Sequence, residues 1–352
     1  MSAQDTRRRF EQWIKNPQCT ANAVSAILNV PMLKVARAEG VITPFGQSPY
    51  ALVRGRKFEQ AIFAKNAAVL REELEKNDIL PKKSAGFADF RLSNAGGPYK
   101  RIEDALAATS AWLLSLKNKT ATETIASGAT IRIPGGVMLP EATLCIDALA
   151  IDFSGARIRL IVGEIKVYPD RGGFTDATQI ATSRAQAGMY VHGLRLTVAA
   201  LTLEDSIEVS DRGFLVLSRS GSNHIKLRPN EDLRAQAQRA QAGLAQLSTE
   251  AQTLQLDSSM GLPVIQKAAT HYCESCLSFC ERAEICHSRA KASHSAAVLG
   301  DDVFRALGGI SLERVKELMN DTAQPIDQHE REILELIRTG QDPDTRQDSP
   351  NE

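Results

Sequence analysis

The stretch ATLCIDALAIDFSGARIRLIVGEIKVY, residues 142–168, decides the fold of this chain. Two runs rich in Ile, Leu and Val are joined by a Ser-Gly turn, which predicts a β-hairpin with strands over 142–153 and 156–168. Apolar side chains occupy both faces of each strand, as in strands buried within a sheet. Asp147 and Glu164 interrupt these runs, and a buried carboxylate is costly unless it is paired or bound to a metal. The hairpin therefore predicts a sheet that carries a polar site.

The spacing of the charged residues suggests what this polar site does. Because strand side chains alternate between faces, Glu164 and Lys166 share one face, and an Asp on the neighbouring strand can converge with them. Asp147 and Glu164 would bind Mg²⁺ or Mn²⁺ through oxygen, and the Lys166 ammonium would orient water or neutralise charge on a phosphate. The alternative is a surface ion pair between Glu164 and Lys166, with Asp147 in a bend.

Elements on both sides of the hairpin complete the predicted fold. A helix over Thr175–Gly193 places Gln186 and Tyr190 on one face, because they are four residues apart. Another helix, Arg56–Asp78, carries Glu59 within an apolar stripe. Further strands are predicted near 128–133, 195–203 and 212–218, and further helices over 101–116 and 231–256. This order predicts an α/β chain with a mixed sheet flanked by helices.

The ordered set Glu59, Asp147, Glu164-Ile165-Lys166 and Gln186-x-x-x-Tyr190 resembles the PD-(D/E)xK nuclease superfamily in its RecB-type branch, which includes the nuclease domains of RecB and AddB and the CRISPR-associated exonucleases. The resemblance covers about residues 55–195. It implies a restriction-endonuclease-like core and metal-dependent hydrolysis of DNA.

The resemblance also implies a metal site for Mg²⁺ or Mn²⁺. Its ligands would be Glu59, Asp147, Glu164 and the backbone carbonyl of Ile165. A long insertion separates Glu59 from Asp147, so the alternative for Glu59 is an ordinary solvated helix residue.

The other matched residues imply how DNA is handled. Lys166 corresponds to the catalytic lysine, while Gln186 and Tyr190 correspond to residues that contact DNA or support the site. The implied enzyme is a deoxyribonuclease, with exonuclease action on single-stranded DNA or duplex ends, in DNA repair or defence against foreign DNA.

No Gly pair is followed by Lys-Ser or Lys-Thr, so the chain lacks a P-loop and unwinding would need a helicase or another repair or defence protein. The alternative function is a non-catalytic DNA-binding or scaffold subunit.

Four cysteines cluster in HYCESCLSFCERAEICHSRA, residues 271–290, with the spacing C-x2-C-x3-C-x5-C. A zinc ribbon usually has two C-x2-C pairs separated by a longer loop, and this spacing is more compact. Four thiolates on so short a segment suit a 4Fe–4S cluster. The favoured ligands are Cys273, Cys276, Cys280 and Cys286. In the resembled branch one cluster cysteine precedes the core, so a second arrangement combines Cys19 with three of these four. Zinc is the alternative metal.

Charge and composition set limits on the class of protein. Lys plus Arg and Asp plus Glu both number 42, so the net charge is zero. A neutral chain does not belong to the class of globally basic proteins that coat DNA. No apolar run reaches the roughly 18 residues of a membrane span, and the N-terminus lacks the apolar stretch of a secretory signal. We therefore expect a cytoplasmic protein with no membrane partner, whose clustered cysteines bind metal.

The composition shifts predict four parts. They are an N-terminal helical segment, 1–50; the nuclease core, 51–230, with an insertion over about 80–125; a helical region with the cysteine motif, 231–338; and a disordered tail, 339–352.

Overall fold

The computed structural model describes residues 13, 15–41, 49–82, 86–133, 142–219, 224–257 and 259–341. The chain divides into two compact units. The first comprises Met1–Ile14, Ala23–Val30 and Gly46–Val264, and the second comprises Lys15–Asn22, Pro31–Phe45 and Ile265–Glu352. The helix predicted over 231–256 thus belongs with the sheet, whereas Cys19 belongs with the other clustered cysteines. Of the predicted tail, residues 342–352 lie outside the described residues.

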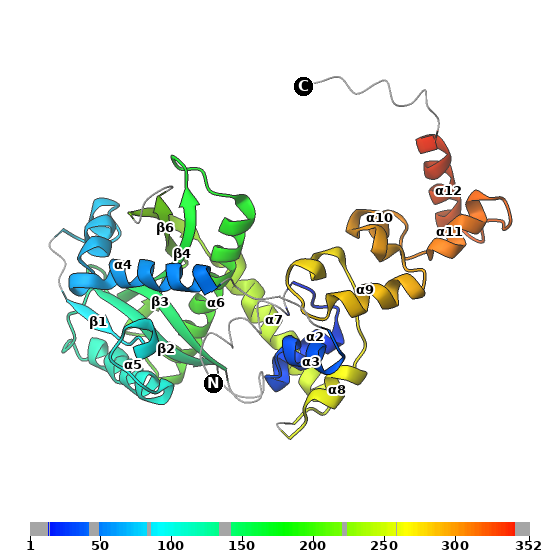
Figure 1. The fold of residues 1–352 in the computed structure, drawn as a ribbon. Helices are drawn as coiled ribbons and strands as arrows, with labels where there is room; N and C mark the ends of the chain where they lie inside the picture. Colours follow the sequence, from blue (N-terminus) through cyan, green and yellow to red (C-terminus); the bar gives the residue numbers. More distant parts are fainter. Residues whose placement is uncertain are drawn as a thin grey trace. The chain divides into compact units, whose positions relative to one another are not determined.

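The first unit is built on a mixed sheet of seven strands, which confirms the expected α/β class (Figure 1). The strands are β1 (Phe87–Asp89), β2 (Ile125–Ile133), β3 (Ala142–Asp152), β4 (Ile158–Asp170), β5 (Ile207–Val209), β6 (Arg212–Arg219) and β7 (Ile225–Asp232). Their order is β1-β2-β3-β4-β6-β7, with β5 paired to β4. The pairs β1–β2, β4–β5 and β4–β6 are parallel, and the others are antiparallel.

The predicted hairpin lies at the centre of this sheet. Strands β3 and β4 pair antiparallel, with Ala148 opposite Gly163 and Asp152 opposite Arg159. Both strands have neighbours on their outer edges, which explains why their residues are apolar on both faces. The hairpin prediction is confirmed.

One face of the sheet is covered by α4 (Pro49–Lys76). Phe58 and Ile62 of this helix pack with Ile165 of β4 and Val216 of β6 in one apolar cluster. The prediction of one continuous helix is wrong in detail, because the backbone leaves helical geometry over Ala64–Ala67.

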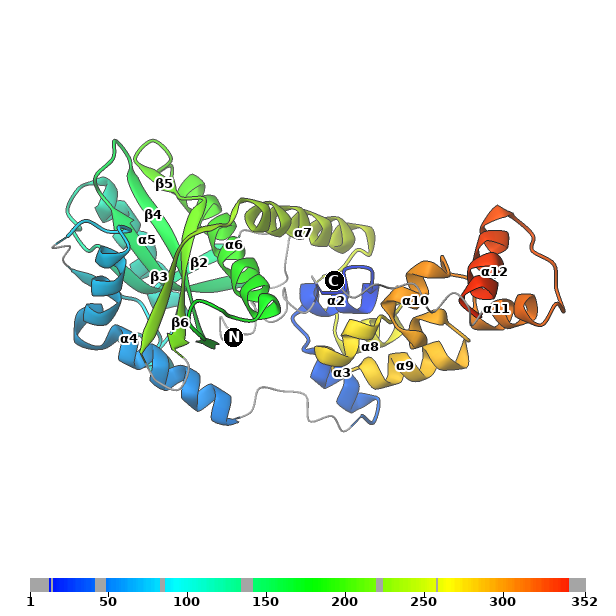
Figure 2. The ribbon, with the colours of Figure 1, turned by 90° about the horizontal axis from the view of Figure 1, so that it is seen from above.

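The opposite face is covered by α6 (Ala177–Ala200), as Figure 2 shows. Ile180 of α6 packs on Leu215 and Leu217, which alternate with Val216 and therefore point away from α4. At the start of α6, the side chain of Asp176 accepts a hydrogen bond of 3.0 Å from the backbone N–H of Gln179.

The predicted end of this helix at Gly193 and the strand predicted near 195–203 are both wrong. The helix continues through Gly193 to Ala200. A Cβ added at Gly193 would lie 2.9 Å from Cδ1 of Ile131, so this glycine allows α6 to approach β2 closely. Glycine here serves helix–sheet packing and does not end the helix.

The remaining helices of the first unit are α5 (Ile102–Lys117) and α7 (Arg234–Thr253), both close to their predicted ranges. A short 3₁₀ helix, η1, spans Ser93–Ala95. The connection between β4 and β6 runs through α6, so the two central parallel strands are joined by a helix crossover.

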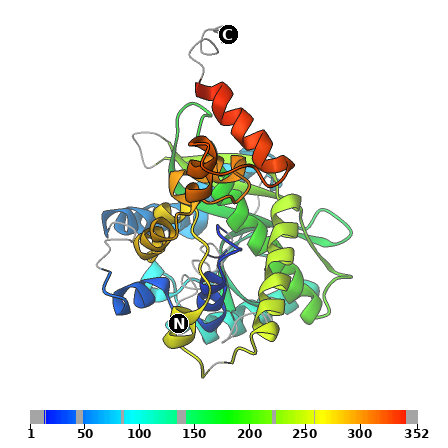
Figure 3. The same ribbon diagram turned by 90° about the vertical axis from the view of Figure 1, so that its right-hand side faces the viewer.

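The second unit is helical. Its helices α9 (Ala283–Ala292), α10 (Asp301–Ala306), α11 (Leu312–Met319) and α12 (Gln328–Gln341) follow the 3₁₀ helix η2 (Glu274–Ser278), with η3 (Ala296–Leu299) between α9 and α10. Figure 3 shows α11 and α12 packed together. The second unit also includes α3 (Met32–Ala38), whereas α2 (Thr20–Leu28) and α8 (Leu262–Lys267) are each divided between the two units. No helix among the described residues is long and apolar enough to cross a membrane.

The packing of β4 against β6 predicts the effect of one substitution. A Cβ at Gly163 would lie 2.2 Å from the ring of Phe214. We expect Gly163→Ala to lower the free energy of unfolding by about 1–3 kcal/mol, because the ring is enclosed and must shift. Gly55→Ala in α4 is the control, since open space surrounds that glycine; it should be neutral or stabilising. Equal urea midpoints for Gly163→Ala and the wild type would contradict this packing.

Candidate active site

The two strand carboxylates lie on neighbouring strands at the point where the pairing of these strands ends. Ala148 and Gly163 are the last pair of the β3–β4 ladder, and Asp147 and Glu164 each lie one residue beyond it. Residues in such positions project from the same face of a sheet. The backbone N–H of Ile165 donates a hydrogen bond of 3.0 Å to Oδ2 of Asp147, which bridges the two strands at this point. The Asp147 side chain thus reaches the backbone next to Glu164, and the convergence of the two carboxylates on one ion stays a prediction.

Glu164 is a fully buried carboxylate with a nearby ammonium. Its exposed fraction is 0%, and Nζ of Lys166 lies 2.7 Å from its Oε1. The Lys166 side chain itself is 14% exposed. A carboxylate buried in this way is tolerated only where opposite charge and hydrogen bonds compensate the loss of water. The predicted Glu-x-Lys motif is therefore an inward-facing pair, and the alternative of an ion pair on the surface does not describe it.

Helix α6 supplies a second donor to Asp147. The hydroxyl of Tyr190 donates a hydrogen bond of 3.3 Å to Oδ1 of Asp147, and the Tyr190 side chain is buried. With Ile165 donating to Oδ2, both oxygens of Asp147 have a fixed donor. Gln186, one turn earlier on α6, is also buried. The four-residue spacing of Gln186 and Tyr190 thus places Tyr190 at the site.

Glu59 is the third carboxylate of the predicted site. It is half-buried on α4, next to Phe58, whose ring packs on the sheet face that carries Ile165. Glu164 and Lys166 alternate with Ile165 and so project from the other face. A role for Glu59 in metal binding stays a prediction.

The carboxylates fit a magnesium-type site in their chemistry. No set of three His, Cys, Asp or Glu side chains within the described ranges could hold a metal ion as it stands. Mg²⁺, however, is commonly held by one or two carboxylates together with water and substrate phosphates, rather than by a cage of protein ligands. Asp147 and Glu164 supply two such carboxylates on one face of the sheet, and the carbonyl of Ile165 stays a predicted third ligand.

The clustered cysteines lie in the second unit and differ in burial. Cys276, Cys280 and Cys286 are buried, whereas Cys273 is only half-buried. The sulfur atoms of Cys273 and Cys276 are 3.4 Å apart. Cys19, remote in sequence, is also buried. The buried thiols are thus Cys19, Cys276, Cys280 and Cys286.

Hydrogen bonds tie the segment around Cys19 to the cysteine-rich segment. Asn16 donates through Nδ2 to the carbonyl of His271 at 2.8 Å and to the sulfur of Cys276 at 3.2 Å. The backbone N–H of Ala21 donates to the carbonyl of Ala269 at 2.9 Å. These contacts flank Cys19 in sequence, so they hold it beside the other thiols.

Burial makes the thiols of Cys276, Cys280 and Cys286 hard to ionise without a cation. It raises the pKa of Cys276 and of Cys280 to about 12. It also raises the pKa of Cys286, against the lowering effect of the Arg282 charge, and a thiolate at Cys19 raises that pKa further. Metal binding requires thiolates and supplies the compensating positive charge. Thiolates are the donor type that an iron–sulfur cluster or zinc takes, and no three of these cysteines are placed as a metal site as they stand in the described residues.

A buried ion pair fixes the backbone between two of these cysteines. Arg282 is 1% exposed, and its Nε and Nη2 lie 2.7 and 2.5 Å from the two carboxylate oxygens of Glu39. Its Nη2 also donates to the carbonyl of Gln266 at 3.2 Å. This two-point contact orients the segment from Cys280 to Cys286.

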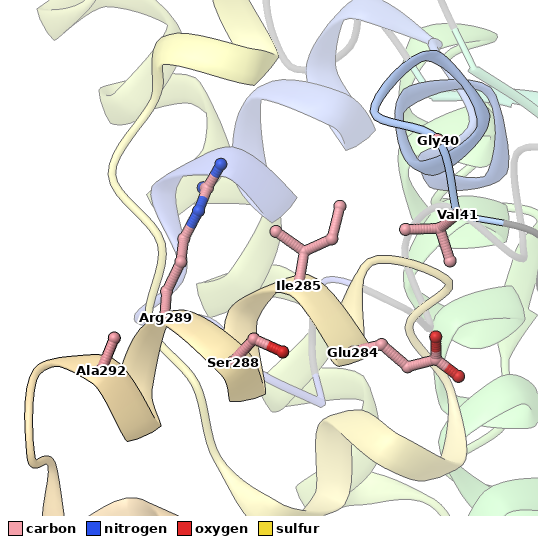
Figure 4. A pocket seen from close by; sticks show the side chains of 7 residues that line it. All are labelled: Gly40, Val41, Glu284, Ile285, Ser288, Arg289 and Ala292. Carbon is pink, nitrogen blue, oxygen red and sulfur yellow. The ribbon is translucent and has the colours of Figure 1, made fainter.

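A shallow recess of the second unit lies beside α9, where Figure 4 shows its lining. Gly40 and Val41 form one wall, and Glu284, Ser288 and Arg289 belong to the other. The charged groups of Glu284 and Arg289 lie at opposite ends of the recess. Since no polar groups converge there, the recess lacks the arrangement of an active site.

Comparisons with known proteins identify no family for this chain. A scan against protein-family models and a search of curated proteins found no match.

Proposed function

We propose that this chain is a metal-dependent DNA nuclease with a restriction-endonuclease-like core. The observation that carries the proposal is the buried pair of Glu164 with the Lys166 ammonium at 2.7 Å, beside Ile165, whose N–H binds Asp147 of the neighbouring strand. The same site receives Tyr190 from the helix that follows. Asp147, Glu164, Lys166 and Tyr190 of the motif order that resembles the PD-(D/E)xK superfamily are thus linked by contacts on two neighbouring strands and α6, which supports the proposal.

The side chains divide the chemistry of phosphodiester hydrolysis between them. A bound Mg²⁺ or Mn²⁺ supplies Lewis-acid polarisation of the phosphoryl oxygen and activates water for attack. Asp147 and Glu164 would hold the ion. Lys166 offers positive charge to the developing negative charge on the phosphate, and its pairing with Glu164 keeps the ammonium in place.

Tyr190 acts as a positioning residue. Its hydroxyl and the backbone N–H of Ile165 hold the two oxygens of Asp147 at a fixed orientation. Such fixed ligands need less reorganisation when an ion and a phosphate bind. Gln186 supports the site from the same helix. The proposed substrate is DNA with a single-stranded or duplex end, and a helicase or other repair or defence protein would provide any unwinding.

We also propose a 4Fe–4S cluster in the second unit. The three C-terminal cysteines that are buried, Cys276, Cys280 and Cys286, would bind it in either arrangement. Burial and the contacts of Asn16 favour Cys19 as the fourth ligand over the half-buried Cys273. A cluster on Cys19 would link two segments far apart in sequence and so stabilise the second unit.

Replacing single cysteines by serine tests this ligand set. Anaerobically purified wild-type protein should be brown and contain iron and sulfide in equal amounts. Cys19→Ser and Cys280→Ser should lose most of the iron, because each removes a thiolate ligand. Cys145→Ser, a cysteine of the sheet, should retain it. A colourless wild type containing zinc would contradict the cluster, and loss of iron in Cys273→Ser but not Cys19→Ser would restore the compact set.

A cleavage assay tests the proposed enzyme. End-labelled single-stranded and duplex DNA are incubated with Mn²⁺, Mg²⁺ or EDTA. We expect cleavage that requires metal and falls by about 100-fold or more in Lys166→Ala, because removing one charged donor from a transition state has an effect of this order. The matched control is Lys117→Ala, at an exposed lysine near the end of α5.

The ladder of products gives the mode of cleavage. Progressive shortening from one end indicates an exonuclease, and internal cuts indicate an endonuclease. A folded wild type that binds DNA without cutting it under any of these conditions would favour the scaffold function. Cleavage that survives Lys166→Ala would contradict the assignment of the site.

A further inference from the structure

The connection between β4 and α6 carries an exposed aromatic ring. Strand β4 ends at Asp170, and α6 begins at Ala177 (Figure 1). Between them, Phe174 has an exposed fraction of 75%. The two elements joined by this turn are those that carry Lys166 and Tyr190. The exposed ring is therefore attached directly to both halves of the proposed active site.

The turn has a defined conformation that keeps the ring exposed. Asp170 is buried, and its Oδ1 accepts a hydrogen bond of 2.8 Å from the N–H of Gly173. Its Oδ2 accepts a hydrogen bond of 3.2 Å from the hydroxyl of Thr175. Arg171 and Phe174 exchange two backbone hydrogen bonds, of 2.9 and 3.3 Å. The buried carboxylate and these contacts fix the turn, so the position of Phe174 is built into the fold.

Positive charge lies next to this ring. Arg171, three residues before Phe174, is exposed. On the neighbouring strand β6, Arg219 pairs in register with Asp170 and is exposed as well. Adjacent strands are about 4.8 Å apart, so both arginines lie at the same end of the sheet. An aromatic face beside cationic groups is the combination that binds single-stranded nucleic acid by stacking and phosphate contact.

The turn lies within a few nucleotides of the proposed site. Strand β4 bulges between Lys166 and Pro169, so from Lys166 to Asp170 the register on β6 advances only from Leu217 to Arg219. At about 3.3 Å per residue, the two positions are about 7 Å apart along the sheet. The ring is therefore near enough for one strand of DNA to reach both Phe174 and the carboxylates of the site.

We propose that a surface made of Phe174, Arg171 and Arg219 binds single-stranded DNA and guides it into the active site. We call this surface the landing. An unpaired base stacks on Phe174, and the phosphates beside it contact the two arginines. Within a paired duplex every base pair except the terminal ones is stacked on both faces, so the ring favours unpaired bases. This inference rests on the proposed nuclease function and adds to it a residue that determines the substrate.

Binding measured without cleavage tests the landing. The full-length protein is titrated, in EDTA, into a fluorescent oligothymidine and into a duplex with blunt ends, and the anisotropy is recorded. The variants are Phe174→Ala and Phe174→Trp. The matched control is Phe153→Ala, since Phe153 is 40% exposed and lies at the opposite end of β4, beyond the end of β3.

We expect Phe174→Ala to weaken binding of the single strand by about 10-fold, the order of effect of losing one stacked base. Phe174→Trp should bind as the wild type does or more tightly, and Phe153→Ala should be unchanged. Binding of the blunt duplex should not respond to either change at Phe174. Single-strand affinity equal to the wild type in Phe174→Ala, or equal losses for single strand and duplex, would overturn the proposal.

A parallel cleavage assay in Mn²⁺ separates this inference from the function beneath it. If the wild-type protein cleaves DNA and Phe174→Ala binds the single strand normally, the landing is excluded and the nuclease function stands. If the wild-type protein binds the single strand through Phe174 but never cleaves it, the nuclease function is excluded and the landing stands. Wild-type protein that does not bind the single strand overturns the landing.

Discussion

The constraint on which the site depends is the burial of the Glu164 carboxylate within a central strand. A buried ion pair is weak evidence for stability, because well-packed apolar side chains of the same volume are often as stable or more so. The pairing of Glu164 with Lys166 inside the sheet therefore calls for a reason other than stability, and the reason we propose is chemistry. The rest of the first unit follows from this, since the hairpin aligns Asp147 with Glu164 and α6 supplies the hydroxyl that orients Asp147.

The second unit also buries groups that are costly to bury as charges, and there the groups are cysteine thiols. The buried thiols of Cys276 and Cys280 resist ionisation, because burial raises the pKa of each to about 12. The buried pair of Arg282 with Glu39 and the contacts of Asn16 hold the surrounding backbone in place. In both units, side chains that are costly to bury as charges are kept together by specific contacts, and in both the proposed compensation is a metal centre.

The hairpin and the burial of Glu164 were predictable because the signals are local. A carboxylate is conspicuous in an apolar strand, and the alternation of side chains fixes which residues share a face. The end of α6 was not predictable, because the role of Gly193 depends on its contact with Ile131 of a distant strand. The edge strand β7 was missed, since its charged residues and Pro229 look like a loop. Likewise, spacing alone does not show that Cys19 joins the other buried thiols.

The most direct test of the central claim is Mn²⁺ binding to the protein without DNA, followed by electron paramagnetic resonance. The account predicts a bound ion whose affinity falls by about 10-fold or more in Asp147→Asn, because an amide is a poorer ligand for a hard cation than a carboxylate. Asp205→Asn, at an exposed aspartate, should bind as the wild type does. Equal Mn²⁺ affinity in the wild type and Asp147→Asn would contradict a metal site at these strands.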